Sequence, residues 1–96
     1  MYAIEYTREA ELDLLSFRKR DQQIIVTAIA HQLHFEPLVV TTNRFRRNPP
    51  DIASWELRVG LFRVYYEVDE QVRIVTIKRH DQTYWRKTEQ RNLLSW

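Results

Sequence analysis

The chain has 96 residues, a formal net charge of +2, and 44% apolar and 12% aromatic residues, enough for one small domain, residues 1–96, with a single core. It contains no cysteine, which excludes a disulfide framework and a thiolate metal site and fits a reducing cytoplasm, where we expect the protein. There is no run of 18 apolar residues and no basic-then-apolar leader. We therefore expect neither a membrane span nor a secretory signal.

The charge is unevenly distributed along the chain. Residues 1–40 hold four Lys/Arg against six Asp/Glu, whereas residues 41–96 hold eleven against seven. This asymmetry favours a basic surface directed at a polyanion such as a nucleic acid. The alternative is that the arginines of the second half serve only solubility.

The first third of the chain predicts a short strand and a helical hairpin. The strand covers 2–6, and Thr7 is a suitable N-cap for a helix over 8–18 that ends in a basic cluster, 18–20. A second helix is predicted over 22–35, capped by Asp21. Apolar residues recur at helical spacing in both: Ala10, Leu14 and Phe17 in the first, and Ile25, Ala28, Ile29 and Leu33 in the second.

The rest of the chain predicts a sheet. Pro37 ends the second helix, and 37–51 reads as a loop that finishes in a Pro-rich turn. Strands are predicted over 53–59, 61–68 and 72–79, with 69–71 as the last turn, and the tail 81–96 as a short helix. The order β-α-α-β-β-β-(α) predicts an α+β fold, in which an antiparallel meander packs its apolar face on the helical hairpin.

The stretch Trp55–Asp69 is the most informative part of the sequence. Apolar residues alternate with polar ones on both sides of Gly60, so one face of this hairpin is core and the other is open. Arg58 and Arg63 fall on the open face, close together across the turn, where they suit a phosphate clamp. The alternative is a cross-strand charge ladder with Glu56 and Glu67.

Two further basic segments are candidates for binding or chemistry. Arg44, Arg46 and Arg47 lie in the predicted loop, where they would contact RNA phosphate or simply be solvated. The third strand ends in Lys78-Arg79-His80, with Tyr84 four residues beyond the histidine. A histidine that transfers protons, beside an arginine and a tyrosine, suits phosphate chemistry, although a histidine at a strand end is often only exposed.

Metals and nucleotide cofactors are not expected. His31 and His34 lie three residues apart, but no third ligand has suitable spacing, so they read as surface residues. Gly60 is the only glycine, which argues against a Gly-rich phosphate loop.

The order of elements together with the hairpin resembles the RelE/ParE superfamily of toxins from type II toxin–antitoxin systems. The residues that carry the resemblance are Pro37 before a basic segment, WELRVG over 55–60, FRVYY over 62–66, and a Val/Ile-rich strand leading into Lys78-Arg79-His80. The match covers essentially the whole chain and implies a RelE-like fold. It is less specific for activity, because RelE-like members cut mRNA in the ribosomal A site whereas ParE-like members poison DNA gyrase.

The resemblance also implies roles for individual residues. Arg63 matches the sheet arginine that holds the scissile phosphate in RelE-like toxins, and Arg79 lies near a catalytic arginine. His80 lies near the catalytic histidine of YoeB-like members and Tyr84 near a C-terminal tyrosine that orients the RNA base, although their spacing differs from the adjacent His-Tyr pair of that type. The paired lysines of RelE are replaced by Glu56 and Arg58.

These observations define the expected function and its alternatives. We expect a toxin that acts as a metal-independent, ribosome-dependent mRNA endonuclease, in which a 2′-hydroxyl attacks its own phosphate. Glu56 or His80 would be the base, and His80 or Tyr84 the acid. The alternatives are a gyrase poison and a non-catalytic relic that only binds its antitoxin. The expected partners are a cognate antitoxin, which alone would contact DNA, and the ribosome with its mRNA.

Overall fold

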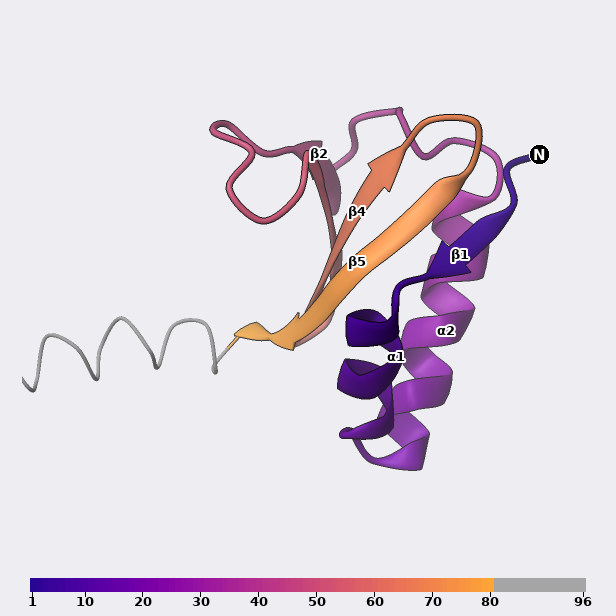
Figure 1. The fold of residues 1–96 in the computed structure, drawn as a ribbon, viewed down its shortest axis with the longest axis vertical. Helices are drawn as coiled ribbons and strands as arrows, with labels where there is room; N and C mark the ends of the chain where they lie inside the picture. The colour runs from indigo at the N-terminus through magenta and orange to yellow at the C-terminus, as the bar shows by residue number, and fades with distance from the viewer. Residues whose placement is uncertain (81–96) are drawn as a thin grey trace, which may run out of the picture.

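The computed structural model describes residues 1–80 of the protein (Figure 1). The predicted helix of the tail 81–96, with Tyr84, lies outside the described residues. The elements are β1 (Ile4–Tyr6), α1 (Arg8–Leu15), α2 (Lys19–Leu33), β2 (Arg44–Arg46), β3 (Trp55–Val59), β4 (Phe62–Val68) and β5 (Val72–Arg79). The strands form one sheet in the order β1-β5-β4-β3-β2, and both helices lie on the same face of it (Figure 1). This α+β arrangement confirms the predicted layers.

The sheet is mixed, whereas we expected a purely antiparallel meander. β2, β3, β4 and β5 are antiparallel to their neighbours, but β1 runs parallel to β5, with Ile4 opposite Val72 and Tyr6 opposite Ile74. The first strand lies at the edge of the sheet, next to the last strand of the meander. Its three residues carry no local signal for direction, so alternation alone does not predict that it runs parallel.

The helical hairpin forms where predicted, with shifted ends. The hydroxyl of Thr7 accepts a hydrogen bond from the backbone N–H of Ala10 at 3.1 Å, which confirms the predicted N-cap. α1 ends at Leu15 because Ser16 turns back onto the carbonyl of Asp13. α2 therefore begins at Lys19 rather than after Asp21, and the basic cluster 18–20 opens the second helix instead of closing the first. No helix of residues 1–80 is both long and apolar enough to cross a membrane.

The predicted loop 37–51 contains a strand. β2 pairs with β3, placing Arg44 opposite Leu57, Phe45 opposite Glu56 and Arg46 opposite Trp55. Because directly opposed side chains of an antiparallel pair lie on the same face, Phe45 shares the open face with Glu56. Arg44 and Arg46 share the helix face of the sheet with the apolar residues of β3.

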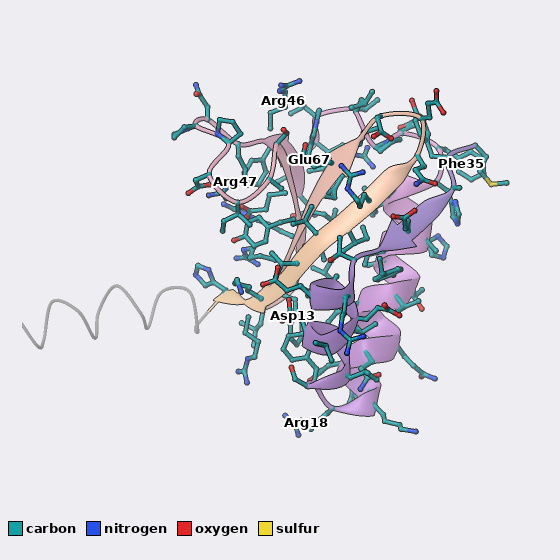
Figure 2. All side chains as sticks on the ribbon, in the orientation of Figure 1. Asp13, Arg18, Phe35, Arg46, Arg47 and Glu67 are labelled. Atoms are coloured by element: carbon teal, nitrogen blue, oxygen red, sulfur yellow. The ribbon has the colours of Figure 1, made fainter. Side chains whose placement is uncertain are left out.

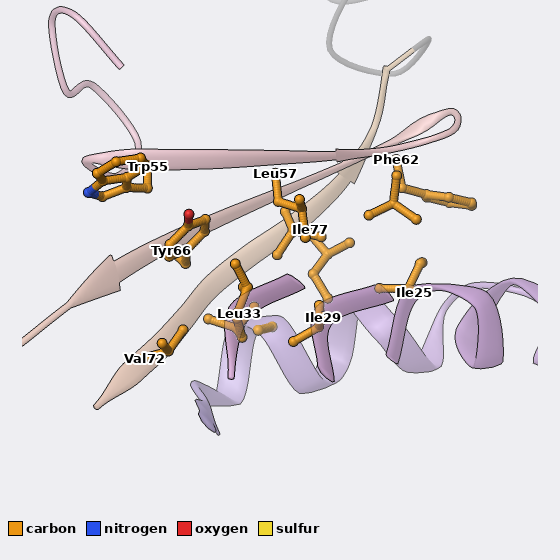
Figure 3. Packing of buried hydrophobic residues seen from close by; sticks show 13 residues of the cluster. Ile25, Ile29, Leu33, Trp55, Leu57, Phe62, Tyr66, Val72 and Ile77 are labelled. Carbon is orange, nitrogen blue, oxygen red and sulfur yellow. The ribbon is translucent and has the colours of Figure 1, made fainter. Parts of the chain in front are cut away.

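The core lies between the helices and the sheet (Figure 3). α2 buries Ile25, Ile29 and Leu33, which confirms its predicted apolar stripe. They pack against a fully or largely buried set from the strands: Trp55, Leu57, Val59, Phe62, Val64, Tyr66, Val72, Ile74 and Ile77. Burying each large apolar side chain contributes about 1.5–3 kcal/mol to stability, so this layer holds the sheet in one register. Because the core uses only the helix face of the sheet, the open face can carry charged side chains.

Tyr66 is the polar group of this core. It is fully buried, its ring stacks on Trp55, and its hydroxyl donates a 2.7 Å hydrogen bond to the carbonyl of Pro37. Burial raises the pKa of Tyr66 above its ordinary value of 10.0, and burial likewise raises the pKa of Tyr65 and of Tyr6. At alkaline pH the unfolded chain therefore loses these protons before the folded protein does.

The sign of the pH dependence follows from that order of ionisation. We expect the contribution of Tyr66 to the free energy of unfolding to be constant below about pH 10 and to fall above it, by up to about 1.4 kcal/mol per pH unit. Tyr66→Phe should cost about 1 kcal/mol at neutral pH, because the Pro37 carbonyl loses its donor, but its stability should fall less steeply above pH 10. Urea unfolding at neutral pH and at about pH 11 measures both effects; parallel losses in wild type and variant would contradict this account.

Candidate functional site

A row of cations crosses the open face of the sheet at one register. Arg58 of β3 lies directly opposite Arg63 of β4, which lies directly opposite Lys78 of β5. Neighbouring strands are about 4.8 Å apart, and directly opposed side chains share a face. Like charges placed opposite one another destabilise a sheet, so three in succession point to an anionic ligand rather than to stability. We call these three residues the cation row.

A buried carboxylate lies beside the row. The side chain of Glu56 is 6% exposed, and its Oε2 lies 3.6 Å from the Nε of Arg58 and 3.6 Å from the Nε of Arg63. Its Oε1 accepts a hydrogen bond from the Nη1 of Arg47. Three guanidiniums thus surround one carboxylate, which satisfies the buried charge and leaves the cluster positive.

This part of the open face is less solvated than its alternating pattern predicts. Glu56 is 4% and Tyr65 is 3% exposed, because the segment 47–54 folds over the sheet on the side away from the helices (Figures 1 and 2). Arg47 stacks 5.0 Å above the ring of Tyr65, and the backbone N–H of Ser54 donates to Glu67 at 2.9 Å. The alternation of residues along a strand does not predict that another segment covers the strand.

Arg47 is held in this cover by Asp51 as well as by Glu56. Its Nε donates to the Oδ1 of Asp51 at 2.8 Å, and its Nη2 lies 2.6 Å from the same oxygen. Partial burial works to lower the pKa of Arg47, but the hydrogen bond to Asp51 and the two carboxylates outweigh it and raise that pKa. The same hydrogen bond holds the pKa of the exposed Asp51 carboxyl below its ordinary value.

The turn between β3 and β4 connects Arg63 with the end of β5. The Nη1 of Arg63 donates to the carbonyls of Gly60 at 2.9 Å and Phe62 at 3.0 Å, which leaves its side chain 13% exposed. The backbone N–H of His80 donates to the carbonyl of Leu61 at 2.6 Å. Gly60 itself has a φ of 56°, a left-handed conformation that favours glycine. The turn therefore places the exposed His80 beside the backbone that holds Arg63.

The predicted site residues divide between the two faces of the sheet. Those that share the open face are Arg47, Glu56, Arg58, Arg63 and Lys78. Arg79 lies opposite Phe62, a core residue, so its register places it on the helix face. His80 follows β5 at the turn, and Tyr84 lies outside the described residues.

Arg44 and Arg46 are not part of an exposed basic loop. Arg44 is 4% exposed, and its guanidinium donates to the carbonyls of Val39 and Gln32. Arg46 is exposed but covers the ring of Trp55 at 5.6 Å on the helix face. Of the three arginines assigned to that loop, only Arg47 reaches the cation row through Glu56, so we leave the other two out of the proposed RNA-contacting surface.

The sequence reasoning missed Tyr65 and Asp51 in this role, whereas it offered Phe45 as a residue that could stack or anchor the basic loop. Phe45 lies beneath the guanidinium of Arg58 at 4.9 Å, Tyr65 beneath Arg47, and Asp51 beside Arg47. Only the four-residue spacing of Arg47 and Asp51 hinted at a pair. Among residues 1–80, no group of three or more His, Cys, Asp or Glu side chains is arranged to hold a metal ion.

The arrangement of two helices on one face of a five-stranded mixed sheet is a RelE-like toxin fold. A solved structure supports this assignment: the chain is similar to a chain of the RelBE2 toxin–antitoxin complex from Mycobacterium tuberculosis. The two share 26% sequence identity with a TM-score of 0.61, and the match covers 81% of this chain and 96% of that one. No protein-family model and no curated protein sequence matches the chain.

Proposed function

We propose that the protein is the toxin of a toxin–antitoxin pair and that its partner is a cognate antitoxin. The similarity to a chain of a toxin–antitoxin complex over nearly all of that chain supports this proposal. An antitoxin that inhibits the toxin must cover the functional surface or distort it. The basic open face offers such a partner a charge-complementary contact.

We propose further that the toxin cleaves mRNA on the ribosome without a metal ion, and the cation row is the single observation that carries this step. In the reaction, the ribose 2′-oxygen forms a bond to the adjacent phosphorus while the bond from phosphorus to the 5′-oxygen breaks. One group removes the proton of the 2′-hydroxyl, and another donates a proton to the departing 5′-oxygen. Arg63, Arg58 and Lys78 supply the positive charge that the phosphate needs as negative charge builds up on it.

The contacts of Glu56 favour a positioning role over that of the base. Both of its oxygens face guanidiniums, and its side chain is 6% exposed, so little of it is left for a substrate hydroxyl. Its position instead orients Arg58 and Arg63 toward the same point. His80 is exposed at the neighbouring turn, and histidine exchanges protons near neutral pH. We therefore assign proton transfer to His80, with Tyr84 as the second proton-transfer group, and leave Arg79 out because its register places it on the helix face.

Inducible expression in a bacterial host tests the proposed function. Growth should stop, and primer extension on a translated mRNA should show new 5′ ends within codons that disappear when translation initiation is blocked. Coexpression of the small protein encoded next to the gene should restore growth. Arrest of DNA replication without new mRNA ends would instead favour a gyrase poison, and normal growth would favour a partner-binding protein without toxicity.

A further inference from the structure

Two aromatic rings on the open face each lie beneath a guanidinium. Arg58 covers Phe45 with 4.9 Å between its Cζ and the ring centroid, and Arg47 covers Tyr65 at 5.0 Å. A guanidinium lying on an aromatic ring gains cation–π and dispersion energy and loses rotational freedom. The two pairs differ in what lies on their outer side.

The Arg47 pair is closed. Its guanidinium contacts Asp51 and Glu56 through separate nitrogens, its side chain is 21% exposed, and Tyr65 beneath it is 3% exposed. Every strong contact of this arginine is made within the protein. This pair therefore holds the segment 47–54 against the sheet.

The Arg58 pair is open. The side chain of Arg58 is 50% exposed, and its one carboxylate contact within residues 1–80 is the 3.6 Å approach of its Nε to Glu56. Phe45 supports the guanidinium from below, and the backbone N–H of Arg58 donates to the carbonyl of Asn43 at 2.7 Å. The group is thus fixed on one side by a ring and on its edge by a carboxylate, while half of its surface meets solvent.

An oriented and half-exposed guanidinium plane is a surface on which an unpaired nucleobase stacks. Arg58 also lies directly opposite Arg63, which is assigned above to the reacting phosphate. These two adjacent side chains fit one nucleotide, with its phosphate at Arg63 and its base on Arg58.

We infer that Phe45 and Arg58 form a stacking platform for one unpaired RNA base next to the phosphate held by Arg63. The inference rests on the proposed RNA-cleaving function and adds its base-binding subsite. Stacking tolerates every base, so the platform contributes affinity and orientation rather than codon preference.

The test uses bacterial ribosomes programmed with an mRNA whose A-site codon carries 2-aminopurine and 2′-O-methyl groups. The methyl groups prevent cleavage, and the fluorescence of 2-aminopurine falls when it stacks. Cosedimentation with the ribosome measures binding separately. We expect wild-type protein to cosediment and quench the probe, and Arg58→Lys, which keeps the charge but not the plane, to cosediment without quenching.

Two further variants separate the platform from general folding or charge effects. Phe45→Leu keeps an apolar side chain but removes the ring, and it should weaken binding of the probe RNA about tenfold and lose the quenching. Arg46→Lys makes the same replacement in the pair with Trp55 on the helix face, outside the proposed RNA-contacting surface, and should quench as wild type does. Quenching by Arg58→Lys at the wild-type level, or binding without quenching by wild type, would overturn the platform while leaving the cleavage proposal standing. Failure of the wild-type protein to cosediment would overturn both.

Discussion

Arg63→Ala should lower the rate of mRNA cleavage on programmed ribosomes about 100-fold or more, and the toxicity of the protein should be lost with it. Removing one fixed donor to a developing oxyanion typically costs two to three orders of magnitude in rate. Arg63 is the central member of the cation row and the best oriented, because Gly60 and Phe62 accept from its Nη1 while its Nε faces Glu56. Single-turnover cleavage of a ribosome-bound mRNA measures the effect directly.

Arg73→Ala is the matched control for that variant. It removes the same charge from the neighbouring strand, β5. Arg73 lies opposite Glu67, which is four residues from Arg63 on β4, so Arg73 is about 13 Å from the cation row. Its guanidinium is 40% exposed and contacts only the exposed Asp69 among the ion pairs of residues 1–80. It should cleave at close to the wild-type rate. Arg73→Ala should unfold within about 1 kcal/mol of wild type because its ion pair is exposed, and Arg63→Ala within about 3 kcal/mol because the buried Glu56 keeps two of its three guanidiniums.

The double variant Arg63→Ala/His80→Ala sharpens the same prediction. If the two residues act on one phosphate, their effects on the rate should not add, because the second loss removes a step that the first has already disabled. A double variant that remains fully toxic would contradict the assignment of the site to this face. Growth assays with matched expression levels distinguish these outcomes without purification.

β3 and β4 were predictable because each alternates apolar and polar residues over at least five positions, and β5 was predictable because it is rich in Val and Ile. β5 begins and ends where expected, and the predicted turn 69–71 is closed by the side chain of Asp69 accepting from the N–H of Gln71 at 3.1 Å. β2 was not predictable, since three residues of Arg-Phe-Arg give no usable period. Its place in the structure is defined by its pairing with β3, a tertiary contact.

The candidate site was predictable in its centre and not at its edges. The alternation in β3 and β4 places Arg58, Arg63 and Glu56 on one face. The burial of Glu56 depends on Arg47, which reaches it from outside the meander across the segment 47–54. Phe45 enters the site only through the register of β2 with β3. Contacts of this kind follow from tertiary closure rather than from local pattern.

Arg44→Met should lower the free energy of unfolding by about 3 kcal/mol. Arg44 lies in the same basic segment as Arg47 but on the helix face, where its guanidinium donates to the carbonyls of Gln32 near the end of α2 and Val39 just beyond it. A cation near a helix C-terminus also interacts favourably with the negative end of the helix dipole. Methionine fills much of the same volume but offers no donor, so buried carbonyls lose their partners. Urea unfolding followed by circular dichroism measures the loss.

Arg46→Met is the control, since it changes the same residue type on the same strand and the same face. Arg46 is exposed, and its one described contact is with the ring of Trp55, so its loss should cost less than about 1 kcal/mol. Equal destabilisation by the two substitutions would contradict the assignment of Arg44 to the fold. If Arg44→Met instead folded normally but bound RNA less tightly, the arginine would return to the functional surface. The contrast between two arginines two residues apart therefore tests whether position in the sheet, rather than charge in the sequence, decides what each one does.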